Sequence, residues 1–431
     1  MATADMHVAV VGLGKIGLPL AALYAGRGAT VSGCDLSEAA VAAVNAGSSP
    51  VVGEPGLVEA VRAARDTGRL EATTDTTAAV AASEVVVVVV PVGVDSEHRP
   101  DFRHLDAAAA AIGAGLRPGA LVILESTVPV GVTRERFAAR LTAASGLGPT
   151  ELRVAYSPER VSSGSVFRDL ATYPKLVGGV DAAAGAAAAA FYREMLAVEV
   201  LLLADAETAE FAKLAESIYR DVNIALANEL ALAAETLGVA FAEVSAAANT
   251  QPYSHLHSPG IGVGGHCIPI YPYFLAAGAD LRLAPLSREI NDAMAEHAAT
   301  RLEAALALEG RGLAGGSVLI LGLSYRGGVK EATLSSALLM ATALRGRGAR
   351  VSVHDPLFSA AEIAALGLEP GTLPPATGVD AVVLQAAHPE YQGLDLAALG
   401  GCRVFLDGRG AFDRGRVEAA GMRYLAIGLG R

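Results

Sequence analysis

Three glycines near the start of the chain have the spacing of a turn that binds a dinucleotide. Gly12, Gly14 and Gly17 follow a short apolar run and precede a stretch rich in alanine and leucine. Glycines in this pattern permit a tight turn and a close approach of the backbone to a pyrophosphate at a helix N-terminus. Asp35 comes about 20 residues later, where its carboxylate can accept hydrogen bonds from ribose hydroxyls and would repel a 2′-phosphate. The pattern therefore predicts a site for NAD.

A cysteine follows a second, denser group of glycines. Residues 260–269 read GIGVGGHCIP, and the cysteine is Cys267. Glycines let the backbone approach a ligand closely, and their amides can stabilise a thiolate or bind an oxyanion. This chemistry favours Cys267 as a nucleophile, and a small buried apolar cysteine is the alternative. For its neighbour His266 we favour a structural role over that of a catalytic base.

The third candidate is Lys213. It lies in the segment Asp205–Gly238, which contains no proline and no glycine before its last residue, so the segment is predicted to be one helix roughly 50 Å long. One interpretation is a solvated lysine that pairs with Glu210 and Glu216 at helical spacing. The other is a lysine that faces the cofactor, and the sequence periodicity leaves both open.

These residues need elements to position them, and the sequence predicts an α/β architecture. Short apolar runs alternate with alanine-rich helical stretches, which is typical of parallel sheets with crossover helices. The chain is predicted to form two Rossmann-like parallel-sheet domains joined by the long central helix, with domains at 1–200, 201–300 and 301–431. A breaker-rich loop is expected over 251–272. The predicted strands are His7–Val11, Thr30–Cys34, Val85–Val90, Leu121–Leu124, Arg153–Tyr156, Ser317–Leu321, Arg350–His354, Asp380–Leu384 and Arg403–Leu406.

Composition narrows the class of protein. The 431 residues are 52% hydrophobic and 18% charged, with 33 Lys and Arg against 45 Asp and Glu, a net charge of −12. An acidic balance argues against nucleic acid as the main partner. The apolar run Val85–Val90 is too short to cross a bilayer, and three widely spaced cysteines suggest no disulfide framework. We therefore expect a cytoplasmic protein with no membrane partner, and no metal, because no metal-ligand spacing is present.

Motifs along nearly the whole chain resemble those of the UDP-glucose/GDP-mannose dehydrogenase family, and most closely its UDP-N-acetylmannosamine dehydrogenase-like branch. The glycine–cysteine segment combined with SPERV is specific to this family. The motifs that carry the resemblance are GLGKIGLPLA, ESTVPVG, YSPERV, AKLAESIYRDVNIALANELA, GIGVGGHCIPIYPYFL, LGLSYRGG, VHDP and DGRG.

The resemblance implies NAD-dependent oxidation of the C6 hydroxymethyl group of a nucleotide sugar to a carboxylate, in a homodimer built on the central helix. It implies that Cys267 is the nucleophile, that Lys213 stabilises oxyanions, and that Thr127 and Glu159 position water and sugar. The implied NAD contacts are Gly12, Gly14, Lys15, Ile16, Gly17, Asp35, Val90, Ser126 and Thr127. The implied substrate contacts are Glu159, Arg160, Val161, Lys213, Ser217, Tyr253, Gly264, Tyr325, Arg326 and Arg409.

The chain departs from the family pattern at several of these positions. Ser217 stands where the family has an oxyanion-binding Asn, and Tyr271 where it has an Asp close to the thiol. Tyr253 occupies the place of an Arg that reaches the sugar from a neighbouring subunit. Arg326 replaces a Lys, and the sequence at Thr333 lacks an Arg that contacts the cofactor pyrophosphate.

The departures leave three readings open. The leading one is a four-electron dehydrogenase with an unusual sugar or nucleotide. The second keeps NAD and the nucleotide sugar but has an altered redox outcome, either an aldehyde product or a transient oxidation. The third is a non-catalytic binder of nucleotide sugar or NAD. A Rossmann dehydrogenase of another family is the outside competitor, and it would need neither the cysteine loop nor the second α/β half.

Overall fold

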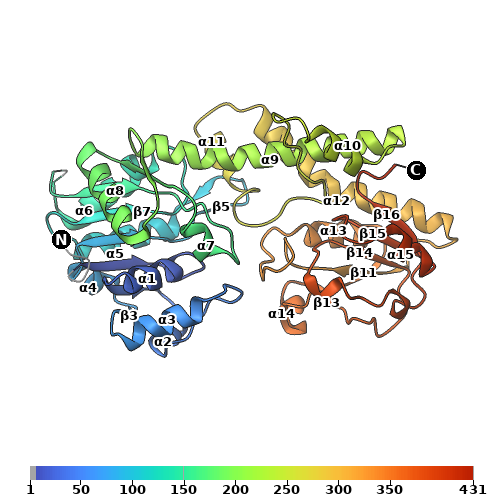
Figure 1. The fold of residues 1–431 in the computed structure, drawn as a ribbon, viewed down its shortest axis with the longest axis horizontal. Coiled ribbons are helices and arrows are strands. Elements are labelled where there is room, and N and C mark those ends of the chain that lie inside the picture. The colour runs from blue at the N-terminus through green and yellow to red at the C-terminus, as the bar shows by residue number, and fades with distance from the viewer. Residues whose placement is uncertain (1–5, 149, 431) are drawn as a thin grey trace. The chain divides into compact units, whose positions relative to one another are not determined.

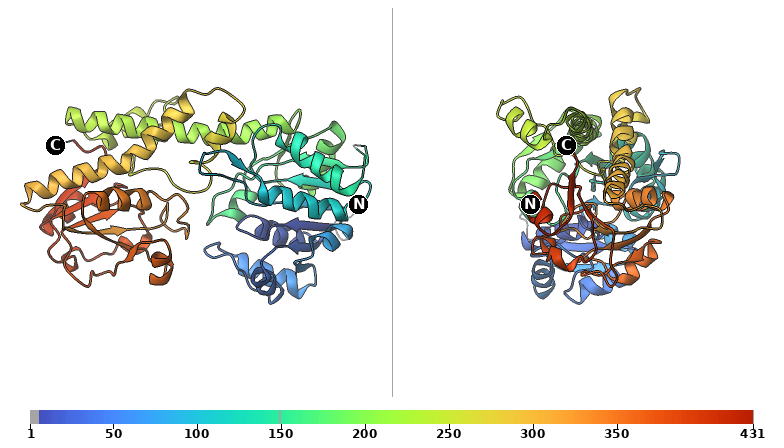
Figure 2. Two further views of the ribbon diagram at one scale, coloured as in Figure 1. Left: turned by 180° about the vertical axis from the view of Figure 1, so that it is seen from behind. Right: turned by 90° about the vertical axis from the view of Figure 1, so that its right-hand side faces the viewer.

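The computed structural model describes residues 6–148 and 150–430, which fall into two compact units. The first unit takes in the chain up to Glu216 together with Tyr273–Asp280. The second takes in Ser217–Pro272 together with the chain from Leu281 onward. Helix α9 (Ala206–Leu237) begins in the first unit and ends in the second, and Figures 1 and 2 show it as one continuous helix.

An eight-stranded sheet forms the centre of the first unit, in the order β10-β9-β8-β7-β4-β1-β2-β3. All neighbouring strands are parallel except β8 and β9, which are antiparallel. A short antiparallel hairpin of β5 (Gly93–Val94) and β6 (Pro100–Asp101) follows β4. The sheet strands are β1 (His7–Val11), β2 (Thr30–Cys34), β3 (Leu70–Thr73), β4 (Val85–Val88), β7 (Leu121–Leu124), β8 (Arg153–Tyr156), β9 (Lys175–Gly179) and β10 (Val200–Leu202).

Apolar side chains of alternate residues fill a core on each face of this sheet. Val8 and Val10 of β1 pack in one core with α1, α3 and α8, whereas Ala9 and Val11 pack in the other with α4, α5 and η2. Both faces of a parallel sheet are normally covered in this way, which explains its continuous apolar runs. The helices of this unit are α1 (Gly17–Gly26), α2 (Glu38–Asn45), α3 (Leu57–Asp66), α4 (Thr76–Ala81), α5 (Arg103–Gly115), η2 (Thr133–Ala138), α6 (Ala139–Ser145), α7 (Val166–Leu170) and α8 (Ala182–Leu196). Helix α11 (Tyr271–Ala276) begins in the second unit and ends in the first.

The second unit has a six-stranded sheet in the order β13-β12-β11-β14-β15-β16, parallel at every described pairing. One face packs against α12, α13 and α14, and the other against a layer that includes Tyr391, Leu394 and Val417. Its strands are β11 (Ser317–Leu321), β12 (Arg350–His354), β13 (Glu369–Pro370), β14 (Ala381–Leu384), β15 (Val404–Asp407) and β16 (Arg423–Ala426). Its helices are α10 (Phe241–Ala248), α12 (Leu283–Leu308), α13 (Ser336–Gly346), α14 (Ala360–Ala365), η3 (Pro389–Tyr391), η4 (Leu396–Ala398) and α15 (Arg414–Ala419).

The predicted α/β class and the long helix are confirmed, with differences at some elements. The strand predicted over Val85–Val90 ends at Val88, because the backbone of Val90 bonds to the Ser126 hydroxyl instead of a strand. The antiparallel β8–β9 pair departs from an all-parallel sheet. Helix α11 begins at Tyr271, inside the predicted loop. In the part of the chain that the structure describes, no helix combines the length and apolarity needed to cross a bilayer.

Candidate functional site

The glycine turn after β1 is shaped by close backbone contacts. Gly12 has φ +98°, and a Cβ there would lie 2.2 Å from the Val89 carbonyl oxygen. A Cβ at Gly17 would lie 1.8 Å from the Gly12 carbonyl oxygen. At Gly14, by contrast, a Cβ would meet no atom within 4 Å. Two glycines are thus required by the fold itself, and the third leaves its backbone open to a ligand at the start of α1.

Asp35 joins this turn to the end of β2. One carboxylate oxygen accepts the Leu13 N–H at 2.9 Å, and the other accepts the Ser37 N–H at 2.9 Å. Each oxygen has a further lone pair, and the side chain is only half-buried. The carboxylate can therefore hold the turn and still accept hydrogen bonds from ribose hydroxyls. These residues fit a dinucleotide.

Ser126 and Thr127 follow β7, which is separated from β1 in the sheet by β4. The Ser126 hydroxyl donates to the Val90 carbonyl oxygen at 2.6 Å and accepts the Val90 N–H at 2.9 Å. Both Ser126 and Thr127 are nearly buried. The structure thus brings Val90 and Ser126 together, at the carboxyl ends of β4 and β7, the edge of a parallel sheet where ligands bind.

Glu159 lies after β8 in a pocket of charged groups. One of its oxygens accepts the Val161 N–H at 2.6 Å, and the other lies 3.9 Å from Lys175 Nζ. Lys175 is buried and pairs with the fully buried Glu125 at 2.8 Å. Tyr192 donates its hydroxyl to the same Glu125 carboxylate. Burial raises the pKa of Glu125, although the Lys175 cation opposes that rise.

Lys213 is buried, with only 8% of its surface exposed, so the interpretation as a solvated lysine is wrong. The two acidic residues at helical spacing bind elsewhere. The Glu210 carboxylate accepts the N–H groups of Gly131 and Thr133 at 2.6 and 2.8 Å, and Glu216 pairs with Arg160 at 2.8 Å. The segment of α9 that carries Lys213 is thereby fixed to the loops after β7 and β8.

Cys267 lies at the end of the glycine-rich loop of the second unit. It is exposed, whereas the other two cysteines, Cys34 and Cys402, are buried. Before it, Gly265 has φ +96° and donates its N–H to the Thr333 carbonyl oxygen at 2.9 Å. A Cβ at Gly264 would lie 2.6 Å from the Leu334 carbonyl oxygen. His266 is exposed, and its Nε2 lies 3.3 Å from the Glu331 carboxylate.

Arg409, which follows β15, lies beside Gly260 at the start of this loop. Its guanidinium donates to the Gln385 carbonyl oxygen and, at 3.1 Å, to the Gln385 side-chain oxygen. A Cβ at Gly260 would lie 3.0 Å from its Nη1. Burial lowers the pKa of Arg409 to about 10. A guanidinium that binds neutral oxygens in a partly desolvated place is suited to an anionic ligand.

The remaining predicted substrate residues of this unit differ in exposure. Tyr325 is half-buried beside the loop, with its ring 3.4 Å from the Cβ position of Gly265. Arg326 is exposed, with its guanidinium 5.9 Å from the centre of the Tyr325 ring. Ser217 is buried on α9, and Tyr253 is 89% exposed.

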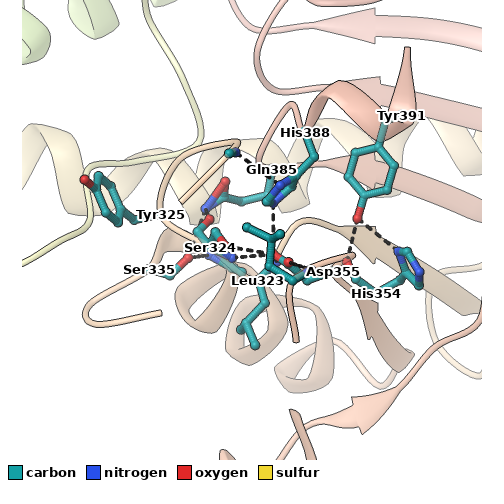
Figure 3. A network of polar contacts seen from close by, with 12 residues as sticks. Leu323, Ser324, Tyr325, Ser335, His354, Asp355, Gln385, His388 and Tyr391 are labelled. Carbon is teal, nitrogen blue, oxygen red and sulfur yellow. Dashed lines mark hydrogen bonds and ion pairs between the residues drawn. The ribbon is translucent and has the colours of Figure 1, made fainter. Parts of the chain in front are cut away.

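A buried polar network supports the Tyr325 loop, and the sequence analysis assigned it no role. Figure 3 shows Asp355 at its centre. One oxygen of Asp355 accepts from the backbone N–H groups of Leu323 and Ser324 at 2.8 Å and lies 3.0 Å from His388 Nε2. Gln385 extends the network toward Ser335 at 3.1 Å. The VHDP motif contains Asp355 and was the one sequence signal for this network. The residues that contact Asp355 follow other strands, β11 and β14, so the sequence did not indicate them.

The predicted residues therefore fall into two sets, each organised within its own unit. The first unit holds the glycine turn, Asp35, Val90, Ser126, Thr127, Glu159, Arg160, Val161 and Lys213. The second holds Ser217, Tyr253, Gly264, Cys267, Tyr325, Arg326 and Arg409.

Sequence patterns of known domains match the same regions. The NAD binding domain of the UDP-glucose/GDP-mannose dehydrogenase family matches residues 6–196, its central domain matches 207–293, and its UDP binding domain matches 319–414. The chain is 35% identical to the UDP-N-acetyl-D-mannosamine dehydrogenase of Pyrococcus horikoshii, over 94% of this chain and 95% of that protein. It is also 35% identical to an NDP-N-acetyl-D-galactosaminuronic acid dehydrogenase of Ralstonia solanacearum, over 96% and 97%.

Solved structures show the same likeness. The structure of the UDP-D-ManNAc dehydrogenase of Pyrococcus horikoshii superposes with a TM-score of 0.89 at 34% identity, covering 98% of this chain and 99% of that one. A UDP-glucose dehydrogenase of Pyrobaculum islandicum superposes with a TM-score of 0.87 at 28% identity, covering 99% and 98%.

Proposed function

The chain belongs to the UDP-glucose/GDP-mannose dehydrogenase family, and from this premise we propose that it oxidises the C6 hydroxymethyl group of a UDP- or dTDP-hexose to a uronic acid through a thioester on Cys267. The family consists of NAD-dependent nucleotide-sugar dehydrogenases, and its NAD binding domain is present. The observation that carries the proposal for Cys267 is its exposure at the end of a glycine-rich loop, since the other two cysteines are buried.

The NAD site of the proposal is the glycine turn of the first unit. Gly14 leaves room for the pyrophosphate at the start of α1, Asp35 accepts from the ribose, and Val90, Ser126 and Thr127 line the sheet edge. The bound cofactor supplies a two-electron oxidant for each of two oxidations. Asp35 selects NAD because its carboxylate would repel a 2′-phosphate.

In this proposal Cys267 is the nucleophile and Lys213 stabilises the negative charge that develops on oxygen. The Cys267 thiolate adds to the aldehyde left by the first oxidation, and the resulting thiohemiacetal is oxidised to a thioester. Lys213, buried and cationic, stabilises the oxyanions that form, and Glu159 and Thr127 position the sugar and the water that hydrolyses the thioester. Overall, one alcohol, two NAD⁺ and one water give one carboxylate, two NADH and three protons.

The second sheet is the proposed nucleotide site. Arg409 would face the diphosphate, with Tyr325, Arg326 and Gly264 beside it. In this proposal residues 1–200 bind NAD, residues 301–431 bind the nucleotide, and residues 201–300 carry the catalytic loop. The named activities of the relatives concern N-acetylated hexosamines on a nucleotide, so these sugars lead the substrate panel. We place the protein in the cytoplasm as a homodimer.

Two residues that depart from the family pattern, Ser217 and Tyr271, favour a second candidate function with a different product. Ser217 is buried and carries a hydroxyl where the family has an amide, and Tyr271 begins α11 where the family has a carboxylate. Losing one oxyanion donor typically costs on the order of 10²-fold in rate. If the oxidation of the thiohemiacetal to the thioester is slowed in this way, the chain releases an aldehyde or returns the first hydride, and the altered redox outcome replaces acid formation.

The stoichiometry of NADH decides between these outcomes. NADH formed at 340 nm is measured against a panel of UDP-, dTDP- and GDP-hexoses and N-acetylhexosamines, with product masses determined in parallel. Two NADH per sugar and an acid product support the proposal, and one NADH with an aldehyde supports the altered outcome. Binding of a nucleotide sugar with no net NADH, and with the sugar recovered unchanged in structure, contradicts both outcomes.

Two variants test the assigned residues. Cys267→Ala should lose acid formation, and Lys213→Ala should lower kcat by on the order of 10²-fold or more. Cys402→Ala is the matched control, because that thiol is buried in the core of the second unit. A Cys267→Ala or Lys213→Ala enzyme as active as the parent removes the corresponding role.

A further inference from the structure

We propose that Asn228 is a positioning residue for Cys267, because its side chain holds the first residue of the glycine-rich loop. Asn228 lies on α9, is fully buried, and accepts the Gly260 N–H with its side-chain oxygen at 2.9 Å. Cys267 closes the same loop seven residues later. This inference rests on the proposed function, since it gives Asn228 a part in the chemistry assigned to Cys267.

The orientation of the Asn228 amide is set by a second asparagine. Asn228 Nδ2 donates to the Asn291 side-chain oxygen at 2.8 Å, and Asn291 lies on α12. With its amide nitrogen committed to Asn291, Asn228 presents its oxygen to Gly260. A backbone N–H that is buried without an acceptor costs a large part of its hydration free energy, so this pairing matters for the loop.

Asn291 is oriented in turn by a buried ion pair. Asn291 Nδ2 donates to the Asp221 carboxylate at 2.8 Å and to the Asp221 carbonyl oxygen at 3.2 Å. Arg288 donates to the same carboxylate at 2.7 Å. All four side chains are at least 95% buried. The result is one chain of hydrogen bonds that runs from Arg288 through Asp221, Asn291 and Asn228 to the loop.

The glycine-rich loop packs beside these hydrogen-bonded side chains, and a second backbone hydrogen bond holds it near Cys267. Ile261 is fully buried in the core of the second unit. A Cβ at Gly262 would lie 3.4 Å from the Asn291 carbonyl oxygen. Gly265 donates its N–H to the Thr333 carbonyl oxygen at 2.9 Å. Two backbone anchors, at Gly260 and Gly265, thus precede the exposed Cys267, and Asn228 supplies the first.

A merely structural asparagine would stabilise the fold without affecting the thiol. A positioning asparagine should also control how the loop is ordered and where its thiol lies. Catalytic groups must be held close to their productive geometry, and a displacement of about 1 Å can cost on the order of 10²-fold in rate. A variant of Asn228 therefore distinguishes the two roles through the rate of hydrogen–deuterium exchange in the loop, the reactivity of the Cys267 thiol, and the separate changes in kcat and KM.

The experiment compares Asn228→Ala, Asn228→Asp and Asn223→Ala in the full chain. Asn228→Asp keeps an acceptor for Gly260. Asn223→Ala is the matched control, because that amide donates to the Tyr219 carbonyl oxygen of the same helix. The measurements are hydrogen–deuterium exchange of peptides covering 258–268, alkylation of Cys267 by iodoacetamide, and the ratio of trapped aldehyde to acid. Since Cys34 and Cys402 are buried, Cys267 should be the site that iodoacetamide reaches first.

In Asn228→Ala we expect loop exchange at least tenfold faster, an alkylation rate changed at least threefold, and kcat for acid lowered tenfold or more with KM within threefold. Asn228→Asp should exchange more slowly than Asn228→Ala, and Asn223→Ala should match the parent. An Asn228→Ala protein that only melts earlier, with parental exchange, alkylation and product ratio, overturns the proposal.

Two outcomes separate this inference from the proposed function. If the parent forms no NADH with any sugar, the proposed function fails, and exchange and alkylation still test Asn228. If Asn228→Ala does not fold, hydrogen–deuterium exchange of the parent protein provides the test. A Gly260 amide that exchanges more slowly than the amides of residues 251–259 supports the proposal. A Gly260 amide that exchanges as fast as they do overturns it.

Discussion

The Asp35 carboxylate holds the glycine turn with both of its oxygens and is also the proposed acceptor for the ribose of the cofactor. It accepts the Leu13 and Ser37 N–H groups, so it shapes the turn that we propose binds the pyrophosphate. It is also placed after β2, where ribose hydroxyls reach it in dinucleotide-binding folds. If the proposed role is right, a substitution of Asp35 changes the preference for NAD over NADP, because it removes both a hydrogen-bond acceptor and a negative charge.

We expect Asp35→Ser to raise KM for NAD about tenfold to a hundredfold and to lower KM for NADP. A hydrogen bond to a charged group contributes about 1.5–3 kcal/mol, and the 2′-phosphate would no longer be repelled. Initial rates with both cofactors measure the change. Asp75→Ser is the control, because Asp75 caps α4 at the surface and serine can replace it as a cap. An unchanged ratio of the two KM values would place the ribose elsewhere.

Single residues show where sequence reasoning ends. The glycine turn and Asp35 lie close together in the sequence, so their spacing alone indicated a dinucleotide site. For Lys213 the sequence does not choose between a solvated side chain and one that faces the cofactor, because helical periodicity does not say which neighbour a side chain contacts. Burial of Lys213 and the distant partners of Glu210 and Glu216 are tertiary facts. Roles carried by the resemblance, including that of Cys267, remain predictions.

At the scale of elements, Glu210 joins α9 to the start of η2. It is fully buried and accepts from Gly131 N, Thr133 N and the Thr133 hydroxyl at 2.6–2.8 Å. Burial nevertheless raises its pKa from 4.5 to about 7. The native state thus binds a proton that the unfolded chain releases between these pH values. The stability that Glu210 contributes is complete below pH 4.5 and is lost as the pH rises through 7.

We therefore expect the stability of the parent relative to Glu210→Gln to fall between pH 5 and pH 8, by up to about 3 kcal/mol at 1.36 kcal/mol per pKa unit. Calorimetric unfolding at several pH values measures this difference. In the control Glu207→Gln, the parent carboxylate has a pKa lowered from 4.5 by its bond to Arg134. Its contribution to stability is lost only as the pH falls below 4.5, so this difference should stay constant between pH 5 and pH 8. Parallel curves for parent and Glu210→Gln would show that Glu210 titrates normally.

Strand β9 brings a lysine into the core beside β7. Lys175 sits at the start of the strand, where it neutralises Glu125, and Tyr192 of α8 completes the contacts of that carboxylate. Sequence analysis did not predict β9, because its apolar run is short and opens with a charge. The sequence did contain one indication of this pair: a lysine within a buried strand usually has a buried acidic partner.

Lys175→Met should destabilise the first unit by about 3–5 kcal/mol, because Glu125 is left as an unpaired buried charge. The double variant with Glu125→Gln should recover most of that loss, since no buried charge then lacks a partner. Thermal unfolding of the four proteins of this cycle gives the coupling. Arg99→Met, which breaks an exposed ion pair with Asp95, should cost less than about 1 kcal/mol. A double variant as unstable as Lys175→Met would show that packing, not charge, dominates.

At the scale of the whole molecule, the two sheets repeat one turn and use it differently. Gly12 and Gly322 have φ of +98° and +96°, and each donates its N–H to the end of the next strand at 2.8 Å. Asp35 and Asp355 both accept from the residue after the glycine. Asp355, however, is buried and bound by His388, whereas Asp35 stays half-buried. The second turn therefore has no carboxylate to offer to a ribose.

The α/β alternation of the two halves is evident in the sequence. The difference between their carboxylates is not, because His388 lies 33 residues after Asp355 and is brought to it by the sheet. The same holds for the asparagines of α9 and α12. Sequence periodicity describes local structure well, and it fails where contacts join distant segments.

The exposed face of α9 bears on assembly. Tyr219, Leu226, Leu230 and Leu237 are exposed and spaced seven, four and seven residues apart, which places them within about 40° of one another around the helix at 3.6 residues per turn. Leu214 and Ala225 of the same helix are instead buried within the chain. The proposed homodimer would bury the stripe of these four side chains against that of a second copy.

Introducing charge into this stripe should separate the copies. We expect Leu226→Glu combined with Leu230→Glu to lower the mass measured by light scattering from that of a dimer toward 43.6 kDa, because like charges would meet and apolar burial would be lost. Leu366→Glu, at an equally exposed leucine next to α14, should leave the mass unchanged. A double variant that keeps the parental dimer mass would show that the copies associate through another surface, and a monomeric parent would remove the proposed homodimer altogether.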